Sequence, residues 1–294
     1  MSLEHPIVAV TGSSGAGTST VRSAFEAIFR RQNITPVYVQ GDAFHRYSRS
    51  EMVTAIERAQ QEGRTVSHFG PEGNLFTELQ DLFREYAETG HGWRRQYLHN
   101  AEEVAEYGGS VDEGEFTPWE RLPGGSDVLF YEGLHGGVVD KGIDVARYVD
   151  FLVGVTPIVN LEWIQKIHRD ANARGYRAED SVETIKRRMD DYVEYITPQF
   201  SRTDINFQRV PLVDTSNPFV AREVPTPDES LVVIRFGEAM KRRVDFPYLL
   251  AMTADAWMSR PNTIVIPGGK LGFAMELILT PFIERLIRGE RIRD

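Results

Sequence analysis

Seven short runs rich in valine, isoleucine and phenylalanine recur along the chain, and longer segments of mixed polarity separate them. Most of these runs lack the alternation of apolar and polar residues that marks a strand with one solvated face. They are therefore typical of strands buried on both faces of a sheet. The predicted strands are Ile7–Val10, Pro36–Val39, Val128–Tyr131, Phe151–Val155, Val210–Val213, Leu231–Phe236 and Thr263–Ile266.

The longer segments repeat apolar residues at the spacing of amphipathic helices. The predicted helices are Thr20–Arg31, Ser50–Glu62, Asn74–Glu88, Asn160–Arg174, Ser181–Ile196 and Leu271–Arg288. Helices that alternate with buried strands predict an α/β fold, a single domain over residues 1–294 with a mostly parallel, mixed sheet of about seven strands covered by helices. Residues 91–126 follow no clean period, and an excursion of this length is more often functional than accidental.

The composition narrows the classes of function. Lys and Arg number 33 against 43 Asp and Glu, which gives a formal net charge of −10. We therefore expect no nucleic-acid partner, and any bound anion must meet a local basic cluster. The absence of cysteine excludes disulfides, thiolate metal sites and thiol switches. No run approaches the ~20 apolar residues of a membrane helix, and the N-terminal residues lack a signal-peptide pattern, so we expect a cytoplasmic protein.

The stretch "TGSSGAGTST", residues 11–20, lies between a predicted strand and a predicted helix, as a phosphate-binding loop does. Its glycines and Ser19 match the pattern G-x-x-x-x-G-K-[ST], but Thr18 stands at the lysine position. The alternative is a glycine-rich turn without a ligand. Backbone amides and the helix N-terminus bind phosphate without that lysine, but the missing charge must come from elsewhere. The predicted nucleotide-binding residues are Gly12, Ser13, Ser14, Gly15, Ala16, Gly17, Thr18, Ser19 and Thr20.

Two acidic residues follow predicted strands, Asp42 after "VYVQG" and Glu132 after "DVLFY". Ligands of parallel sheets sit at the carboxyl ends of strands, and a strand-end acid near magnesium is typical of P-loop enzymes. The segment "GDAFHRYSR" adds His45, Arg46 and Arg49, a cluster suited to an anionic substrate. The alternatives are a capping role for each acid and a solvated basic face for the cluster.

The position of Asp42 depends on the order of the strands. We expect Pro36–Val39 to lie next to Ile7–Val10, the strand that leads into the glycine-rich loop. This order would place the Asp42 carboxylate opposite a phosphate bound by the loop.

A second basic cluster lies in residues 160–177, where Lys166, Arg169, Asp170 and Arg174 share one helical face. An exposed ladder of alternating charges that includes Glu162 would show the same spacing. We favour a lid that delivers a cation to a transferring phosphoryl group, because the loop lacks its lysine. Any of the three basic residues could supply that cation.

These motifs together resemble the bacterial phosphoribulokinases, the octameric class I group of the P-loop phosphoribulokinase/uridine kinase family. The segments that carry the resemblance are "TGSSGAGTST", "GDAFHRYSR", "FYEGLHGG", "NLEWIQKIHRD" with "RGY", "RTDINFQRVPLVDTSNPF" and "DFPYL". The resemblance implies ATP- and Mg²⁺-dependent phosphorylation of D-ribulose 5-phosphate at O1, a Calvin-cycle reaction of carbon fixation. It implies catalytic roles for Asp42, Asp170 and Arg169, substrate binding by His45, Arg49, Lys166 and Arg174, and magnesium binding by Ser19, Glu132 and Asp170.

The resemblance also implies a homo-oligomer, typically an octamer, that is activated by NADH and inhibited by AMP. The basic residues that it associates with these effectors are Arg31, Arg187, Arg188 and Arg235. Two other functions stay open on the residues alone: a uridine-kinase-like small-molecule kinase, and a nucleotide-binding regulator without turnover. The chain has no N-K-x-D motif, which argues against a GTPase switch.

Overall fold

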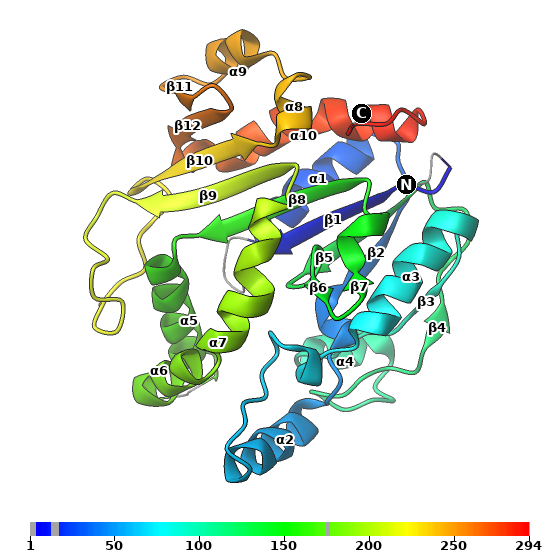
Figure 1. Cartoon of the computed structure of the whole chain (residues 1–294), viewed down its shortest axis with the longest axis vertical. Coiled ribbons are helices and arrows are strands. Elements are labelled where there is room, and N and C mark those ends of the chain that lie inside the picture. The colour runs from blue at the N-terminus through cyan, green and yellow to red at the C-terminus, as the bar shows by residue number, and fades with distance from the viewer. Residues whose placement is uncertain (1–3, 13–17, 175–176, 294) are drawn as a thin grey trace.

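The computed structural model describes residues 4–12, 18–174 and 177–293. Its centre is an eight-stranded sheet in the order β11-β12-β10-β9-β8-β1-β5-β2 (Figure 1). The strands are β1 (Ile7–Gly12), β2 (Pro36–Gln40), β5 (Val128–Gly133), β8 (Phe151–Pro157), β9 (Ile205–Pro211), β10 (Ser230–Phe236), β11 (Trp257–Arg260) and β12 (Thr263–Pro267). The five strands from β9 to β2 pair in parallel, whereas β10, β12 and β11 pair antiparallel. The predicted α/β fold with a mixed sheet is confirmed.

Three details of the sheet differ from the sequence prediction. The strand expected at Val210–Val213 lies earlier, as β9, because Ile205 and Phe207 are the residues that enter the core. Strand β11 was missed, since a short edge strand with little buried surface leaves a weak pattern. The expected pairing of β2 with β1 is wrong. Strand β5 lies between them. The connection from β1 to β2 passes over one strand position, and β5, which comes later in the chain, fills that position.

Five predicted helices are present with small shifts at their ends. They are α1 (Thr18–Gln32), α2 (Arg49–Gln61), α3 (Phe76–Thr89), α5 (Val159–Arg174) and α10 (Leu271–Ile287). The helix expected over Ser181–Ile196 is divided into α6 (Ala178–Arg187), α7 (Met189–Asp191) and a π-helical turn at Tyr192–Ile196. The division falls at Arg188, whose backbone has φ −96° and ψ 8°, outside the helical range. Shorter helices are α4 (Ala101–Tyr107), α8 (Glu238–Lys241) and α9 (Phe246–Met252).

The core lies on both faces of the sheet, which explains the uninterrupted apolar runs. Along β1, Val8 and Val10 pack with α1 and α10, whereas Ile7 and Ala9 pack with α3 on the opposite face. Because successive residues of a strand point to opposite faces, a strand covered on both sides must be apolar throughout.

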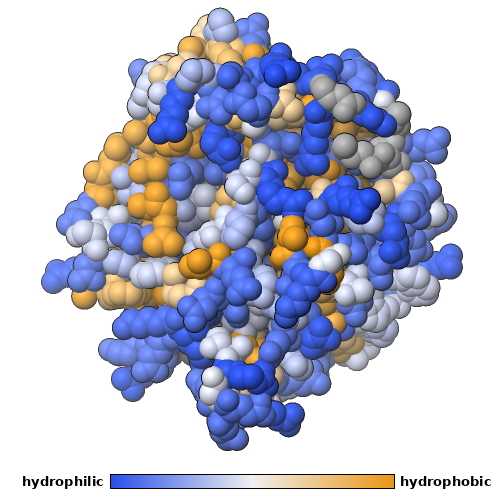
Figure 2. Space-filling model, in the orientation of Figure 1, coloured by the Kyte–Doolittle hydropathy of each residue, from blue (hydrophilic) through white to orange (hydrophobic). Residues whose placement is uncertain are grey.

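The remaining segments project from this core. Helices α5 and α6 follow the carboxyl end of β8, and α2 extends farther from the sheet (Figure 1). The excursion 91–126 contains α4 and the ribbon of β3 (Trp93–Arg94) and β4 (Glu120–Arg121), while β6 (Val139–Asp140) pairs with β7 (Ile143–Asp144). Hydrophilic residues cover most of the face in Figure 2, and apolar residues gather over the loop between β9 and β10. Among the described residues, no helix is long and apolar enough to cross a membrane.

Candidate active site

Asp42 lies in a short 3₁₀ turn, Gly41–Phe44, at the carboxyl end of β2. The turn packs closely on β5: a Cβ atom on Gly41 would lie 2.6 Å from the Tyr131 hydroxyl oxygen. Buried Ala43 and Phe44 fix the turn in the core, while the Asp42 side chain remains 38% exposed. The fold therefore presents one carboxylate on a firmly anchored support.

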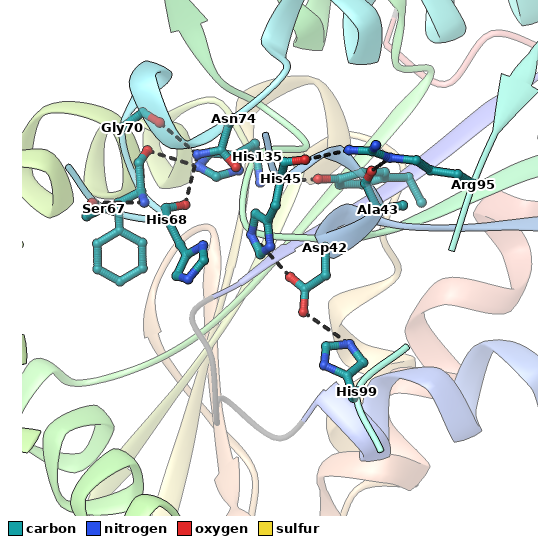
Figure 3. A network of polar contacts seen from close by, with 12 residues as sticks. Asp42, Ala43, His45, Ser67, His68, Gly70, Asn74, Arg95, His99 and His135 are labelled. Carbon is teal, nitrogen blue, oxygen red and sulfur yellow. Dashed lines mark hydrogen bonds and ion pairs between the residues drawn. The ribbon is translucent and has the colours of Figure 1, made fainter. Parts of the chain in front are cut away.

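Two histidines flank this carboxylate (Figure 3). His45 Nε2 lies 3.5 Å from Asp42 Oδ1, and His99 Nε2 lies 3.4 Å from Oδ2. Burial, together with the charges of His99 and Arg95, lowers the pKa of His45 to about 4. His45 is therefore neutral near pH 7, so it orients Asp42 without placing a full positive charge beside it.

The excursion 91–126 supplies His99, and it also supplies Arg95. The Arg95 guanidinium donates to Ala43 O at 2.8 Å and to His45 O at 2.6 Å, and it lies 3.6 Å from the centroid of the Phe116 ring. Arg95 thus ties the excursion to the turn that carries Asp42. Sequence reasoning missed both residues, although a basic and aromatic stretch, "WRRQYLH", marked the excursion.

The predicted cluster after Asp42 divides in two. Arg49, in the first turn of α2, donates to Glu113 Oε1 at 2.6 Å and to His99 O at 2.7 Å, so it stays with the excursion near Asp42. Arg46 instead donates to the backbone oxygens of Glu72 and Asn74. The structure therefore brings His45 and Arg49 toward Asp42, whereas Arg46 stabilises the loop around residues 72–74.

Helix α5 carries the second predicted cluster. Lys166 and Asp170 form an ion pair on one face of the helix, and both residues are buried. Ser181 Oγ donates to Asp170 Oδ2 at 3.4 Å, and Arg169 Nε lies 3.9 Å from Oδ1. The interpretation of this face as an exposed ladder is wrong, since Glu162 is also buried, where it accepts a hydrogen bond from Tyr192. The Arg174 side chain lies outside the described part of the chain.

Burial shapes the charges around Lys166. Desolvation and the charge of neighbouring Arg188 lower the pKa of Lys166 to about 8, although the ion pair with Asp170 acts in the opposite direction. Arg188 lies over the Phe69 ring, 4.3 Å from its centroid, and burial lowers the Arg188 pKa to about 10. Both side chains remain predominantly cationic at pH 7, and the buried carboxyl groups of Asp170 and Glu162 lie beside them.

Glu132 lies inside β5, between the two strands that lead to the functional segments. It pairs with Val10 of β1 on one side and with Gln40 of β2 on the other. It also lines a cleft of about 220 Å³ together with Arg22 and Arg94. The described residues contain no group of three or more His, Cys, Asp or Glu that could hold a metal ion alone. A magnesium ion beside Glu132 would therefore need further oxygen ligands, such as phosphate oxygens.

Most of the glycine-rich loop lies outside the described residues, namely positions 13–17 and the side chains of Thr18 and Ser19. Gly12 and Thr20 are the described residues at the two ends of this loop. A Cβ atom on Gly12 would lie 2.5 Å from Val155 O, so the close approach of β8 requires glycine there.

The four arginines predicted to respond to effectors contact different elements. Arg31 Nη2 lies 2.6 Å from Glu276 of α10, and Arg235 donates to Phe200 O at 2.7 Å. Arg187 closes α6, and Arg188 lies beside Lys166. Their predicted regulatory role stays a prediction.

The chain resembles known proteins in sequence and in structure. The model described as "Phosphoribulokinase / Uridine kinase family" matches residues 7–216. The chromosomal phosphoribulokinase of Cupriavidus necator is 58% identical over 288 residues, which cover 98% of this chain and 97% of that protein. The phosphoribulokinase of Nitrobacter vulgaris is 57% identical over 289 residues, 98% of either chain. The solved phosphoribulokinase of Rhodobacter spheroides aligns with a TM-score of 0.89 at 52% identity and covers 98% of this chain and 99% of its own.

Proposed function

Because the chain belongs to the phosphoribulokinase and uridine kinase family, we propose that it transfers the γ-phosphoryl group of ATP to O1 of D-ribulose 5-phosphate. The product would be ribulose 1,5-bisphosphate, the substrate of Calvin-cycle carbon fixation. The observation that carries the proposal is Asp42, a partly exposed carboxylate held between two histidines at the carboxyl end of a parallel strand. The choice of acceptor is supported by relatives named phosphoribulokinase that match the chain over nearly its whole length.

Asp42 acts in this mechanism as the general base. Its carboxylate accepts the proton of the O1 hydroxyl while that oxygen forms a bond to the γ-phosphorus and the bond to the ADP oxygen breaks. The imidazoles of His45 and His99 keep the carboxylate oriented. Magnesium, when bound with ATP, would neutralise charge on the phosphates, and Glu132 would help to hold it.

Lys166 and Arg169 supply the positive charge that the glycine-rich loop lacks. Lys166 is held by Asp170, so we assign Asp170 a positioning role through this ion pair. A cation fixed near the transferring group stabilises the transition state most when it need not reorganise. Helix α5 with residues 175–177 would act as the lid, and His45, Arg49, Lys166 and Arg174 would bind the sugar phosphate.

The proposal extends to regulation and assembly. It includes a cytoplasmic homo-octamer that NADH activates and AMP inhibits, with Arg31, Arg187, Arg188 and Arg235 as the basic residues involved. No thiol switch is included, because the chain has no cysteine.

ATP consumption in the presence of magnesium tests the proposal, with ribulose 5-phosphate, uridine and pantothenate as alternative acceptors and with NADH present or absent. We expect turnover with ribulose 5-phosphate alone, and ³¹P NMR should identify the 1,5-bisphosphate. Turnover with uridine would favour the uridine-kinase-like alternative. ATP binding without turnover of any acceptor would favour a regulator.

A further inference from the structure

His68 lies between the two halves of the site and has no role in the mechanism above. Its ring is 4.4 Å from the ring of His45, centroid to centroid, with 40° between the planes (Figure 3). Phe69, the next residue in the chain, lines a small pocket together with Lys166 and Arg188. His68 is therefore in ring contact with His45 beside Asp42 and next in sequence to the pocket that holds Lys166.

The backbone around His68 is tightly held. Ser67 Oγ donates to Asp191 Oδ2 at 2.6 Å, and Asn74 Nδ2 donates to His68 O at 3.0 Å and to Gly70 O at 2.7 Å. A Cβ atom on Gly70 would lie 2.8 Å from Asp191 Oδ2, so a larger residue there would displace the carboxyl group that Ser67 binds. Hydrogen bonds that fix the backbone in this way are typical of residues whose side chains bind a ligand.

The ring nitrogens of His68 distinguish it from the neighbouring histidines. Nδ1 is buried and has no hydrogen-bond partner within residues 4–12, 18–174 and 177–293. Buried His135, in contrast, pairs its Nε2 with Phe69 O at 3.0 Å, and His45 faces Asp42.

Burial and the nearby His45 lower the pKa of His68 to about 3, so its ring is neutral near pH 7. A neutral imidazole carries one N–H, and the enclosed Nδ1 has no acceptor within reach in the described structure. The tautomer with the proton on Nε2 avoids burying an unpaired donor. Because Nδ1 is enclosed by protein, Nε2 is the ring nitrogen that a ligand can reach.

We propose that His68 binds the acceptor, with its Nε2–H donating a hydrogen bond to a hydroxyl or phosphate oxygen of the sugar phosphate. This assignment rests on the proposed function for the identity of the acceptor. His68 would complete a row of donors from His45 to Lys166 along the bound sugar.

Three substitutions separate binding from packing. Glutamine places an amide N–H near the position of Nε2, asparagine places one near Nδ1, and phenylalanine keeps the ring contact with His45 without any donor. We expect His68→Phe and His68→Asn to raise the KM for ribulose 5-phosphate by about 10- to 100-fold, the loss of one hydrogen bond to a charged or strongly polar group. His68→Gln should restore most of the affinity. The KM for ATP should change less than about twofold in all three.

Exposed His91→Gln is the control for substitution of a histidine outside the site, and melting curves check that each variant folds. If His68→Phe kept the parent KM for the sugar phosphate, His68 would serve only to pack against His45. Equal losses in all three variants, glutamine included, would also overturn the assignment. Failure of the proposed function would look different, because the parent enzyme itself would not turn over ribulose 5-phosphate. The same KM comparison would then be made with the acceptor that the parent does phosphorylate.

Discussion

Substitution of Asp42 by asparagine removes the charge and the basicity of the proposed base and changes little else. The two side chains have nearly the same size, and an amide can keep one contact each with His45 and His99. Because Asp42 is 38% exposed, its loss of charge should alter the free energy of unfolding by less than about 1 kcal/mol.

The expected effect on catalysis is far larger. Loss of a general base lowers kcat by about 10²- to 10⁴-fold, which corresponds to roughly 2.7–5.4 kcal/mol in the activation free energy. That range exceeds the stability change several-fold, so the two effects can be told apart in one variant. ATP affinity should persist, because the proposed phosphate loop and Glu132 are on other strands.

The assay is kcat with saturating ATP and ribulose 5-phosphate, beside nucleotide affinity by calorimetry and a denaturant titration. Asp81→Asn is the matched control, since Asp81 is a comparably exposed carboxylate paired with Arg84 on α3, outside the site. A fall in kcat of less than tenfold for Asp42→Asn would refute its assignment as the base. Loss of nucleotide binding together with activity would refute the argument that the substitution is local.

Three further predictions concern charge. Arg169→Ala should lower kcat more than it raises the KM for the sugar phosphate, and Arg49→Ala should mainly raise that KM; the same kinetic pattern in both would contradict the division of roles. The value of kcat/KM should fall above about pH 8, where Lys166 loses its proton. Lys166→Arg should move this fall to higher pH. If the fall stayed at the same pH in that variant, Lys166 would not be its source. Burial raises the pKa of Asp150 to about 6, so between about pH 4 and pH 6 the folded protein keeps a proton that the unfolded chain has lost, and stability falls as pH rises. Asp150→Asn cannot ionise and should therefore gain about 1–3 kcal/mol over the parent across that window in urea titrations; a constant difference would contradict the shifted pKa.

The sequence by itself determined the elements that depend on neighbouring residues. Apolar runs located six strands of the sheet, and helical periodicity located five helices, because burial on two faces or on one face leaves a local pattern. The position of Asp42 after a strand was also predicted in this way, because ligands of parallel sheets bind at the carboxyl ends of strands. The same local rules misplaced β9 and missed β11, where polar residues interrupt the apolar run or the strand is short.

Only the tertiary structure decided which distant residues meet. The insertion of β5 between β1 and β2, and the approach of His99 and His68 to the Asp42 region, depend on contacts between segments far apart in the chain. The i,i+4 spacing of Lys166 and Asp170 is the same in an exposed ladder and in a buried pair. Packing of α5 against α6 made it the buried pair, because burial is a property of the surrounding elements and not of the spacing.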